Sequence, residues 1–512
     1  MKAAQRLLEY AHARGVTACF ANPGTSEMHL VAALDAVPGI RPILALFEGV
    51  ATGAADGFGR MAHAPALTLL HLGPGLGNGL ANLHNAKRAH TPVVSLIGEH
   101  ATYHRANDPP LATDIESIAA PVSSWLRTVE RPEDLVSAGA DAIDAAHRLG
   151  PAALVLPADV AWSDVEPSAP CTADTAAAAP AWADNIDAVA STLRPGALLF
   201  LGGRRLSGAA CAAAHAIALK TGCKLLVETF PARIARGAGS AALQRLPYLS
   251  EMAAAALSDV GAIVLAGATA PVAFFALPGR PTRLAADSAH IVPWASPTDD
   301  VEAALLALAR VVVAETQAAR PSETPPAPDS GDALDPMSLA QAIAATLPDH
   351  AIVSDESNTL GLFAFDACAN AAPHDWLTLT GGSIGQGLPV ATGAAVACPD
   401  RRVVALEADG SALYTIQTLW TQAREGLNVT NVILNNGAYA ILKLEMMRAG
   451  VHAQTQAASD LFDLRRPTID FLQIAAGFGV PGQRVTSPRD LVSALKRSFA
   501  TPGPYLIEAV FP

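Results

Sequence analysis

The sequence predicts an α/β protein made of three doubly wound domains, each built on a parallel sheet. Short, almost continuously apolar runs such as TPVVSLIGE, GAIVLAG and TNVILNN alternate with helical stretches, which is typical of parallel strands covered on both faces. The chain of 512 residues is also too long for one hydrophobic core. Two proline- and alanine-rich segments, Ser163 to Trp182 and Thr316 to Pro336, interrupt the pattern as linkers do. We therefore expect domains at residues 1–165, 182–316 and 336–512.

The expected elements can be placed in order along the chain. The first part opens with the helix MKAAQRLLEYAHARGV and contains the strands PALTLLHL and TPVVSLIGE around the helix NGLANLHNAKRA. The second part has the strands ALLFLGG, KLLVET and GAIVLAG. The third has AIVSDES, RRVVALEADG, TNVILNN and PYLIEAVF, with one helix expected at ALYTIQTLWTQAREG. Ligands of such sheets bind at the carboxyl ends of the strands, so polar residues that follow strands are the candidates for a site.

Composition excludes several classes of partner. The net charge of −13 argues against a nucleic acid or an anionic membrane surface as the binding partner. The six cysteines are scattered without a C-x-x-C pair, so we expect neither a disulfide framework nor a zinc site. The N-terminus reads as a helix rather than a signal peptide, and no apolar run approaches about 18 residues. We expect a cytoplasmic protein.

Hard oxygen ligands follow two strands of the third part. Asp409, Gly410 and Ser411 come after RRVVALEA, and Asn435, Asn436 and Gly437 come at the end of TNVILNN. Two neighbouring strand ends would bring Asp409 and Asn436 together, as magnesium or calcium requires, and the following helix N-terminus can bind an anion. Each motif alone could equally be an N-capped helix start or a turn. Together they suggest a metal site that holds a diphosphate.

This pattern resembles the thiamine-diphosphate motif. Over nearly its full length the chain resembles the superfamily of acetolactate synthase, benzoylformate decarboxylase and pyruvate decarboxylase. The resemblance implies a pyrimidine-binding, a central and a diphosphate-binding domain, in that order. It also implies that Asp409 and Asn436 bind Mg2+ through their side chains and Ala438 through its carbonyl. Ala408 stands where the family has glycine, a departure that removes no ligand.

The resemblance extends to further residues around the cofactor. Ile384 in GGSIGQGLP matches the aliphatic wedge beneath the cofactor, and Gly382 matches the residue whose carbonyl accepts from the pyrimidine amino group. Tyr414 and Tyr439 could cap the diphosphate or could be packing aromatics. The full set of expected cofactor-binding residues is Asn22, Pro23, Gly24, Asn358, Gly382, Ile384, Asp409, Gly410, Ser411, Tyr414, Asn436, Gly437, Ala438 and Tyr439.

The expected catalytic residues are Glu48, His71 and Thr25 of the first part. A glutamate at a helix start is commonly held by backbone amides, but Glu48 matches the family glutamate that hydrogen-bonds the aminopyrimidine and so promotes ylide formation. His71 ends the strand ALTLLH where benzoylformate decarboxylase has a histidine, and it is either a proton relay or a core residue. NPGTSE resembles the family's turn after the first strand, which implies that Thr25 can meet the substrate carboxylate.

Substrate fit is expected to depend on Thr25, His71, Phe275, Ile441 and Leu442, with KLEMMRAGVHAQTQ as a closing loop. Benzoylformate decarboxylase has a second active-site histidine in its middle domain. Here the segment APVAFFALPG has Phe274 and Phe275 and no histidine. His100 and His104 could compensate from a loop, or could simply be exposed.

The expected function is that of a thiamine-diphosphate- and Mg2+-dependent 2-oxo acid decarboxylase or carboligase. The resemblance implies ylide addition, loss of carbon dioxide and an enamine that is protonated or attacks a second carbonyl; the sequence does not decide between these outcomes. FAD is not expected, since GGRRLSGAACAAAHA and LAGATAPVAFF carry no flavin signature. Glu48 and Asp409 lie in different domains, and in this family they meet across subunits, which implies a homodimer or homotetramer.

Two alternatives come from other classes. A non-catalytic homologue could bind the cofactor, or none, and act as a regulatory partner. An NAD-dependent oxidoreductase is suggested by the glycine-rich HLGPGLGNG and by Glu99 at the end of the next strand. The oxidoreductase leaves Glu48, Asp409 and Asn436 unexplained.

Overall fold

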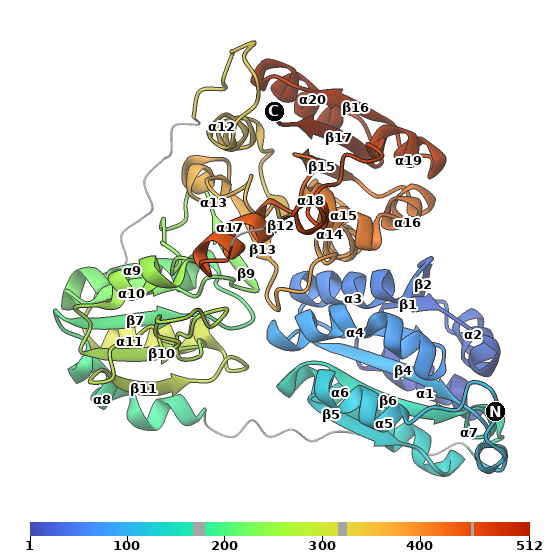
Figure 1. Cartoon of the computed structure of the whole chain (residues 1–512). Helices are drawn as coiled ribbons and strands as arrows, with labels where there is room; N and C mark the ends of the chain where they lie inside the picture. Colours follow the sequence, from blue (N-terminus) through green and yellow to red (C-terminus); the bar gives the residue numbers. More distant parts are fainter. Residues whose placement is uncertain (167–179, 316–324, 452–454) are drawn as a thin grey trace.

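A computed structural model of the chain describes residues 1–166, 180–315, 325–451 and 455–512. The described residues form three lobes, each with a central sheet covered by helices (Figure 1). The predicted linkers at 163–182 and 316–336 lie partly outside the described residues, as does part of the predicted closing loop. No helix in the described ranges combines the length and the apolar character that a membrane crossing needs.

The first lobe contains a six-stranded sheet in which every pairing is parallel. Its strands, in spatial order, are β2 (Arg41–Leu44), β1 (Ala18–Asn22), β3 (Ala66–Leu70), β4 (Val93–Glu99), β6 (Ala152–Pro157) and β5 (Trp125–Thr128). Its helices are α1 (Ala3–Ala13), α2 (Met28–Ala36), α3 (Glu48–Ala62), α4 (Leu72–Arg88), α5 (Ile115–Ala119), α6 (Leu135–Leu149) and α7 (Ala158–Trp162).

The second lobe contains a four-stranded parallel sheet. Its strands, in spatial order, are β11 (His290–Ala295), β10 (Ala262–Ala266), β7 (Ala197–Leu201) and β8 (Lys224–Val227). Its helices are α8 (Ile186–Thr192), α9 (Gly208–Thr221), α10 (Ser250–Leu257) and α11 (Val301–Val311).

The third lobe contains a seven-stranded sheet that is parallel except for one edge strand. Its strands, in spatial order, are β16 (Gly482–Val485), β17 (Tyr505–Val510), β15 (Val429–Asn435), β14 (Val403–Ala408), β12 (Ala351–Glu356), β13 (His374–Thr378) and β9 (Arg233–Arg236). Its helices are α12 (Pro336–Thr346), α13 (Ala364–Ala367), α14 (Gly387–Ala397), α15 (Asp409–Thr415), α16 (Thr418–Glu425), α17 (Ala440–Arg448), α18 (Gln456–Asp460), α19 (Phe471–Gly477) and α20 (Pro488–Ala500). The predicted fold class, three α/β units on parallel sheets, is confirmed.

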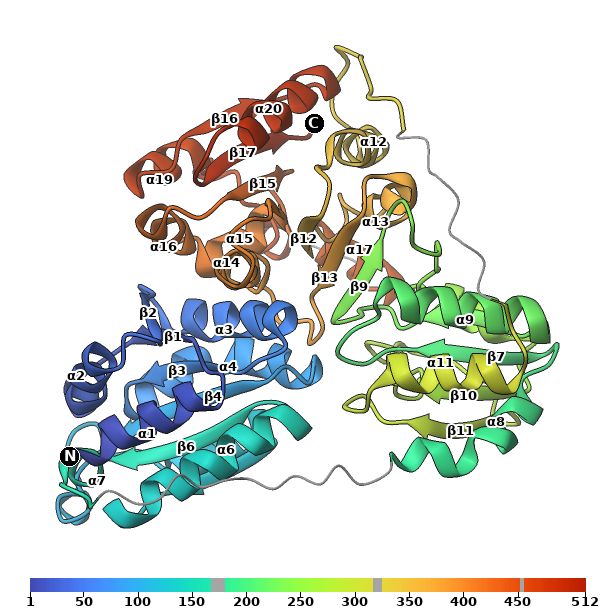
Figure 2. The ribbon, with the colours of Figure 1, turned by 180° about the vertical axis from the view of Figure 1, so that it is seen from behind.

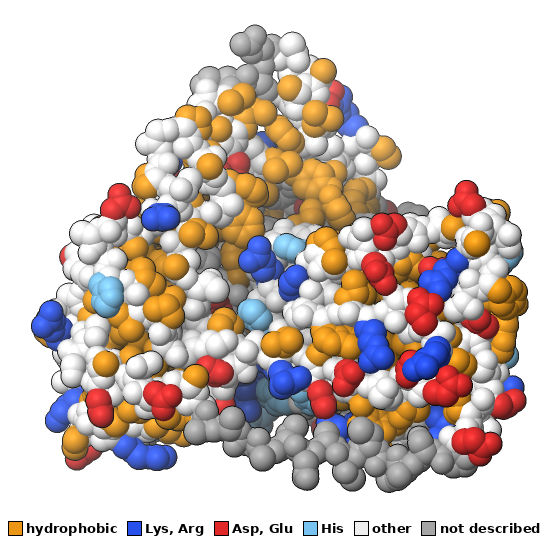
Figure 3. Space-filling view, turned by 90° about the horizontal axis from the view of Figure 1, so that it is seen from below, with side chains coloured by type: hydrophobic (Ala, Val, Ile, Leu, Met, Phe, Trp, Pro, Cys, Tyr) orange, Lys and Arg blue, Asp and Glu red, His pale blue; other side chains and the backbone are white. Residues whose placement is uncertain are grey.

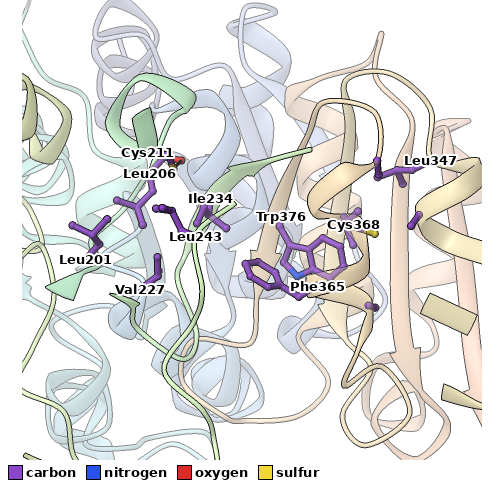
Figure 4. Close-up of a cluster of buried hydrophobic side chains, with 14 of the residues drawn as sticks. Leu201, Leu206, Cys211, Val227, Ile234, Leu243, Leu347, Phe365, Cys368 and Trp376 are labelled. Atoms are coloured by element: carbon purple, nitrogen blue, oxygen red, sulfur yellow. Dashed lines mark hydrogen bonds between the residues drawn. The ribbon is translucent and has the colours of Figure 1, made fainter. Parts of the chain in front are cut away.

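The antiparallel edge strand β9 comes from the middle part of the chain and joins it to the third lobe. Arg233 pairs with Asp375 of β13 at 2.8 Å, and the guanidinium of Arg236 stacks 3.6 Å over the ring of Phe365. Buried side chains on both sides of this strand therefore form one continuous hydrophobic cluster, from Leu201 and Val227 to Trp376 and Leu347 (Figure 4). Figure 2 shows the strand reaching from the middle lobe to the third.

Helices α3 and α14 pack so closely that they place the first lobe against the third. A Cβ atom added to Gly57 would lie 2.0 Å from the carbonyl oxygen of Val390, and one added to Gly393 would lie 1.8 Å from that of Ala54. A buried ion pair between Arg60 and Asp56 (2.6 Å) continues this contact. Arg60 also donates to the carbonyls of Ala232 and Thr378, so one side chain contacts all three lobes.

Two details of the sequence prediction were wrong. The single helix expected after Asp409 is two helices, α15 and α16, because i to i+3 hydrogen bonds replace the α-helical ones between Ile416 and Trp420. The expected closing loop is helical from Lys443 to Arg448, within α17. The glycine-rich run that suggested the alternative of an NAD-dependent oxidoreductase is helical from Leu72, inside α4.

Seen from below, the lower two lobes lie side by side with charged side chains spread over them. Hydrophobic side chains gather in the hollow at the centre of this face (Figure 3).

Candidate active site

One pocket lies at the carboxyl ends of β12, β14 and β15 and collects most of the residues predicted to bind the diphosphate and the metal. Its lining includes Asp409, Asn436 and Ala438, the three predicted metal ligands. The rest of the lining is Ser357, Asn358, Thr359, Leu360, Ile384, Ala408, Gly410, Ser411, Leu434, Tyr439, Ala440 and Ile441. The register of the parallel strands explains this convergence, because Ala408, the last residue of β14, pairs with Leu434, the penultimate residue of β15.

Asp409 is held rigidly at the first residue of α15. Its two carboxylate oxygens accept from the backbone N–H groups of Gly410 (2.8 Å) and Gly437 (2.7 Å). Burial raises the pKa of Asp409, and these N–H groups oppose the shift. The side-chain oxygen of Asn436 lies in the same loop and accepts from the N–H of Ala438 at 3.0 Å. A carboxylate is thus fixed beside amide and carbonyl oxygens.

This set of ligands fits a magnesium ion that also binds phosphate. The part of the chain that the structure describes contains no group of three or more His, Cys, Asp or Glu side chains suited to a metal. One carboxylate with neutral oxygens leaves coordination positions for the oxygens of a diphosphate, as Mg2+ prefers. The N-terminus of α15 and the hydroxyl of Ser411, which accepts from Asn358 at 3.1 Å, line the same pocket.

Glu356 fixes the loop that carries Ile384. Its carboxylate accepts from the N–H groups of Gly385, Gln386 and Gly387 at 2.6–2.7 Å. Burial raises the pKa of Glu356 to about 7, and the three N–H groups oppose that rise. Ile384, which comes just before these three residues, is thereby held in the lining of the pocket.

The two candidate tyrosines differ in their surroundings. Tyr439 lines the pocket and packs its ring on Gly410, where an added Cβ would lie 2.3 Å from the ring. Tyr414 is 54% exposed and packs on Gly385. Burial raises the pKa of Tyr439, and the neighbouring Tyr414, whose hydroxyl is hydrogen-bonded to that of Tyr439, and the Asp409 carboxylate raise it further. Of the two, Tyr439 alone lines the pocket around Asp409.

The predicted catalytic residues of the first lobe lie at the ends of other strands. Glu48 is the first residue of α3 and is 8% exposed, and Oε2 accepts from Asn78 of α4 at 2.9 Å. Thr25 is exposed in the turn after β1, next to Gly24, Pro23 and Asn22. Asn22 donates to the carbonyl of Ala45 at 2.8 Å. These residues form a separate group, since the lining of the pocket around Asp409 comes entirely from the third lobe.

His71 is held by a carboxylate that sequence reasoning missed. Nδ1 of His71 lies 2.8 Å from Oε2 of the fully buried Glu27. Glu27 also accepts from the N–H of Gly24 (2.7 Å) and from the hydroxyl of Ser26 (2.7 Å). Because a carboxylate only accepts, the arrangement favours a proton on Nδ1 and leaves Nε2 available for acid–base chemistry.

The remaining candidates lie apart from this pair. Ile441 lines the diphosphate pocket, and Leu442 beside it is 44% exposed. Phe275 is 59% exposed and contacts Phe274. The rings of His100 and His104 stack edge to face at 5.6 Å, and Nε2 of His100 is buried without a hydrogen-bond partner.

Two further features were missed from the sequence. Asn82 and Asn85 of α4 reach across to the third lobe and donate to the carbonyls of Gly385 (3.2 Å) and Ser383 (2.8 Å). Glu407, one residue before Ala408, is fully buried and neither carboxyl oxygen has a hydrogen-bond partner. Burial raises the pKa of Glu407 well above its usual range. Glu407 is the penultimate residue of β14, whereas Asn82 and Asn85 lie inside α4, so only Glu407 had a strand-end position to mark it in the sequence.

Comparison with known proteins gives two family matches. Residues 1–118 match the thiamine pyrophosphate enzyme family in its N-terminal TPP-binding domain. Residues 359–509 match the C-terminal TPP-binding domain of the same family. The two matched regions contain, respectively, Glu48 with His71 and the pocket around Asp409.

Relatives and solved structures match over the full length. A Mycobacterium tuberculosis protein that carries the name acetolactate synthase large subunit IlvX is 52% identical, over 100% of this chain and 99% of its own. Benzoylformate decarboxylase of Pseudomonas aeruginosa is 29% identical, over 98% of this chain and 97% of its own. The structure of the thiamine diphosphate-dependent 4-hydroxybenzoylformate decarboxylase of Rhodococcus jostii RHA1 superposes with a TM-score of 0.85. The two sequences are 25% identical, and the match covers 100% of this chain and 99% of the other.

Proposed function

The chain belongs to the thiamine pyrophosphate enzyme family, and we propose that it is a Mg2+-dependent member that removes carbon dioxide from a 2-oxo acid. The acyl group is then released as an aldehyde or joined to a second carbonyl. The observation that carries the proposal is the convergence of Asp409, Asn436, Ala438 and Ile384 on one pocket at the carboxyl ends of β14 and β15. The names of the relatives, acetolactate synthase and benzoylformate decarboxylase, agree with both outcomes.

We assign the residues of the pocket to binding. Asp409, Asn436 and the carbonyl of Ala438 would hold Mg2+, while Gly410, Ser411 and Asn358 would bind the diphosphate. The N–H of Gly437 donates to the carboxylate of Asp409 and so connects the loop after β15 to the start of α15. Thiamine diphosphate, when bound, supplies a carbon nucleophile for the 2-oxo carbonyl and accepts the electron pair that carbon dioxide leaves behind.

The first lobe supplies the proton chemistry in this proposal. Glu48 would hydrogen-bond the pyrimidine ring and hold the proton that passes to and from it, with Asn78 keeping its carboxylate in place. His71, oriented by Glu27, would move a proton at the reacting acyl group through Nε2. Thr25 would donate to the carboxylate of the substrate.

The separation of Glu48 from the diphosphate pocket supports an active site shared between two copies of the chain. No residue of the first lobe lines that pocket in the part of the chain that the structure describes. In a symmetric pair of subunits, the Glu48 of each copy would lie at the pocket of the other copy, which gives two equivalent sites. We therefore propose a homodimer, alone or within a tetramer, as the active form.

Titration of the apo-protein with thiamine diphosphate and MgCl2, followed by 2-oxo acids, tests the proposal. We expect Mg2+-dependent binding by calorimetry and then release of carbon dioxide. Absence of cofactor binding would remove the proposed function. Binding without turnover of any acid in a panel of pyruvate, branched and aromatic 2-oxo acids would favour a regulatory homologue instead.

A further inference from the structure

Four aromatic residues of the middle lobe form a cluster beside the proposed active site. Phe274 lies at its centre, with ring centroids 6.0 Å from Phe230, 5.6 Å from Tyr248 and 5.0 Å from Phe275. The rings meet edge to face or tilted, as aromatic pairs prefer. Phe230 follows β8, and Phe274 and Phe275 follow β10, at the carboxyl edge of the middle sheet, while Tyr248 lies just before α10.

The first link between the cluster and the active site runs through Gly382. A Cβ atom on Gly382 would lie 2.3 Å from the ring of Phe274, so the ring packs directly on the backbone of this residue. Gly382 has a φ of +75°, which glycine adopts without strain. Two residues further on, Ile384 lines the diphosphate pocket. Phe274 therefore lies on the loop that forms one side of the pocket.

The second link runs along α17. Ile441 lines the pocket, and Glu445, one turn later on the same face of the helix, is hydrogen-bonded to the hydroxyl of Tyr248. Arg448 at the end of α17 pairs with Glu251 of α10 at 2.6 Å and fixes the helix on the middle lobe. The cluster thus lies between the pocket loop and α17.

The cluster presents open apolar surface instead of being sealed in the core. Phe274 is 44% exposed and Phe275 is 59% exposed, although Phe274 is surrounded by three other rings. Large apolar side chains exposed at the edge of a site are typical of ligand binding. An additional ring could pack on Phe274 and Phe275 in the same edge-to-face manner. A methyl group would contact only a small part of this surface.

We propose that Phe230, Tyr248, Phe274 and Phe275 form the wall against which the acyl donor binds, and that the preferred donor is a 2-oxo acid with an aromatic side chain. This inference rests on the proposed function, because it places the donor at the same site. Phe274 and Phe275 are the specificity-determining residues. Phe230 and Tyr248 position them, with Tyr248 fixed by Glu445.

The test compares benzoylformate with pyruvate on the holoenzyme reconstituted with thiamine diphosphate and Mg2+. We expect kcat/KM for carbon dioxide release to be about tenfold or more higher for benzoylformate, since a well-filled apolar pocket discriminates by at least that factor. Phe275→Ala should reduce this ratio severalfold, and Phe275→Leu should keep part of it. Val272→Ala, which alters an exposed apolar residue of the same segment outside the ring cluster, is the matched control.

Binding of unreactive analogues separates this inference from the proposed function. Benzoylphosphonate and acetylphosphonate carry a phosphonate in place of the carboxylate and cannot lose carbon dioxide. Tighter calorimetric binding of benzoylphosphonate supports the aromatic wall even in an enzyme that turns over no acid. Equal or tighter binding of acetylphosphonate, or a wild-type preference for pyruvate, would overturn it. The inference would also be overturned if Phe275→Ala changed the oligomeric state but left two ratios unchanged: that of kcat/KM for benzoylformate and pyruvate, and that of the affinities for the two phosphonates. The cluster would then be a subunit interface.

Discussion

Glu27 and His71 form a pair at the carboxyl ends of β1 and β3, with 2.8 Å between Oε2 of the carboxylate and Nδ1 of the imidazole. The glutamate is fully buried, whereas the histidine side chain is 24% exposed and so has access to the surface. The hydroxyl of Ser26 lies 3.2 Å from the same nitrogen. The pair therefore has one fixed, buried member and one that faces outward.

Replacing Glu27 with glutamine should lower turnover and leave cofactor affinity unchanged. The neutral amide cannot stabilise a protonated His71, so we expect kcat to fall about tenfold to hundredfold. Steady-state kinetics, with thiamine diphosphate binding measured separately, would test both expectations. Glu130→Gln, which alters an exposed carboxylate paired with Arg105, is the control. Unchanged kcat in Glu27→Gln would contradict a positioning role.

The sequence predicted the regular parts of this fold and failed where contacts between distant segments decide the structure. β4 and β15 were expected because apolar residues form most of each run, and all but the last residue of β15 are buried. β9 was not expected, because its four residues include two arginines whose partners, Asp375 and Phe365, lie more than a hundred residues away. No local pattern could have indicated that pairing.

The same distinction applies to the site. Asp409 and Asn436 each follow an apolar strand, so the rule for parallel sheets was enough to predict that they converge. Glu27 lies in a 3-10 turn, and it meets His71 only because Asn22 pairs with Leu70 in the sheet. The exposed ring of Phe275 was expected at the site, but the packing of Phe274 on Gly382 required the three-dimensional structure.

Substitution of Gly57 should destabilise the contact between the first and third lobes. In Gly57→Ala the new Cβ would meet the carbonyl oxygen of Val390 at 2.0 Å, so α3 and α14 must move apart. We expect a loss of about 1–3 kcal/mol, as for other overpacked cores. Differential scanning calorimetry should show a lower melting temperature. Gly77→Ala in α4, where an added Cβ meets no atom within 4 Å, should be neutral or slightly stabilising. Equal changes in melting temperature for Gly57→Ala and Gly77→Ala would refute the steric argument.

Glu228 should make the protein less stable as pH rises. Burial raises the pKa of Glu228 to about 8, although the N–H of Gly203 opposes the shift. Below the ordinary pKa of glutamate, the Glu228 carboxyl is neutral in both the folded and the unfolded state. Its contribution to the free energy of unfolding is then fully present. Between that pH and about 8 the unfolded chain releases the proton and the folded one keeps it, which costs up to about 1.4 kcal/mol per pH unit.

Glu228→Gln removes this titration, so the variant should gain stability over the wild type as pH rises from 5 to 8. Apparent melting temperatures at several pH values measure the difference. Glu133→Gln, an exposed glutamate in the first lobe, serves as the control. A constant difference between Glu228→Gln and the wild type across this range would show that Glu228 does not titrate in it.

Single substitutions at the two halves of the proposed active site should have different effects. Glu48→Gln should keep cofactor binding but slow turnover by about a hundredfold or more, because the proton at the pyrimidine loses its acceptor. Asp409→Ala should abolish Mg2+-dependent cofactor retention, because the only carboxylate among the proposed metal ligands is lost. Calorimetry with thiamine diphosphate and MgCl2 distinguishes the two variants. Cofactor retention by Asp409→Ala at the wild-type level would remove Asp409 from the metal site.

Mixing these two inactive variants tests whether the active site is shared between subunits. A heterodimer of Glu48→Gln and Asp409→Ala would contain one site with both residues intact and one site with neither. Random exchange of subunits should therefore restore roughly one quarter of wild-type activity. The control is each variant alone, unfolded and refolded in the same way, which should stay inactive. If Glu48 and Asp409 of the same chain formed each site, every site in the mixture would carry one defect, and no activity would return.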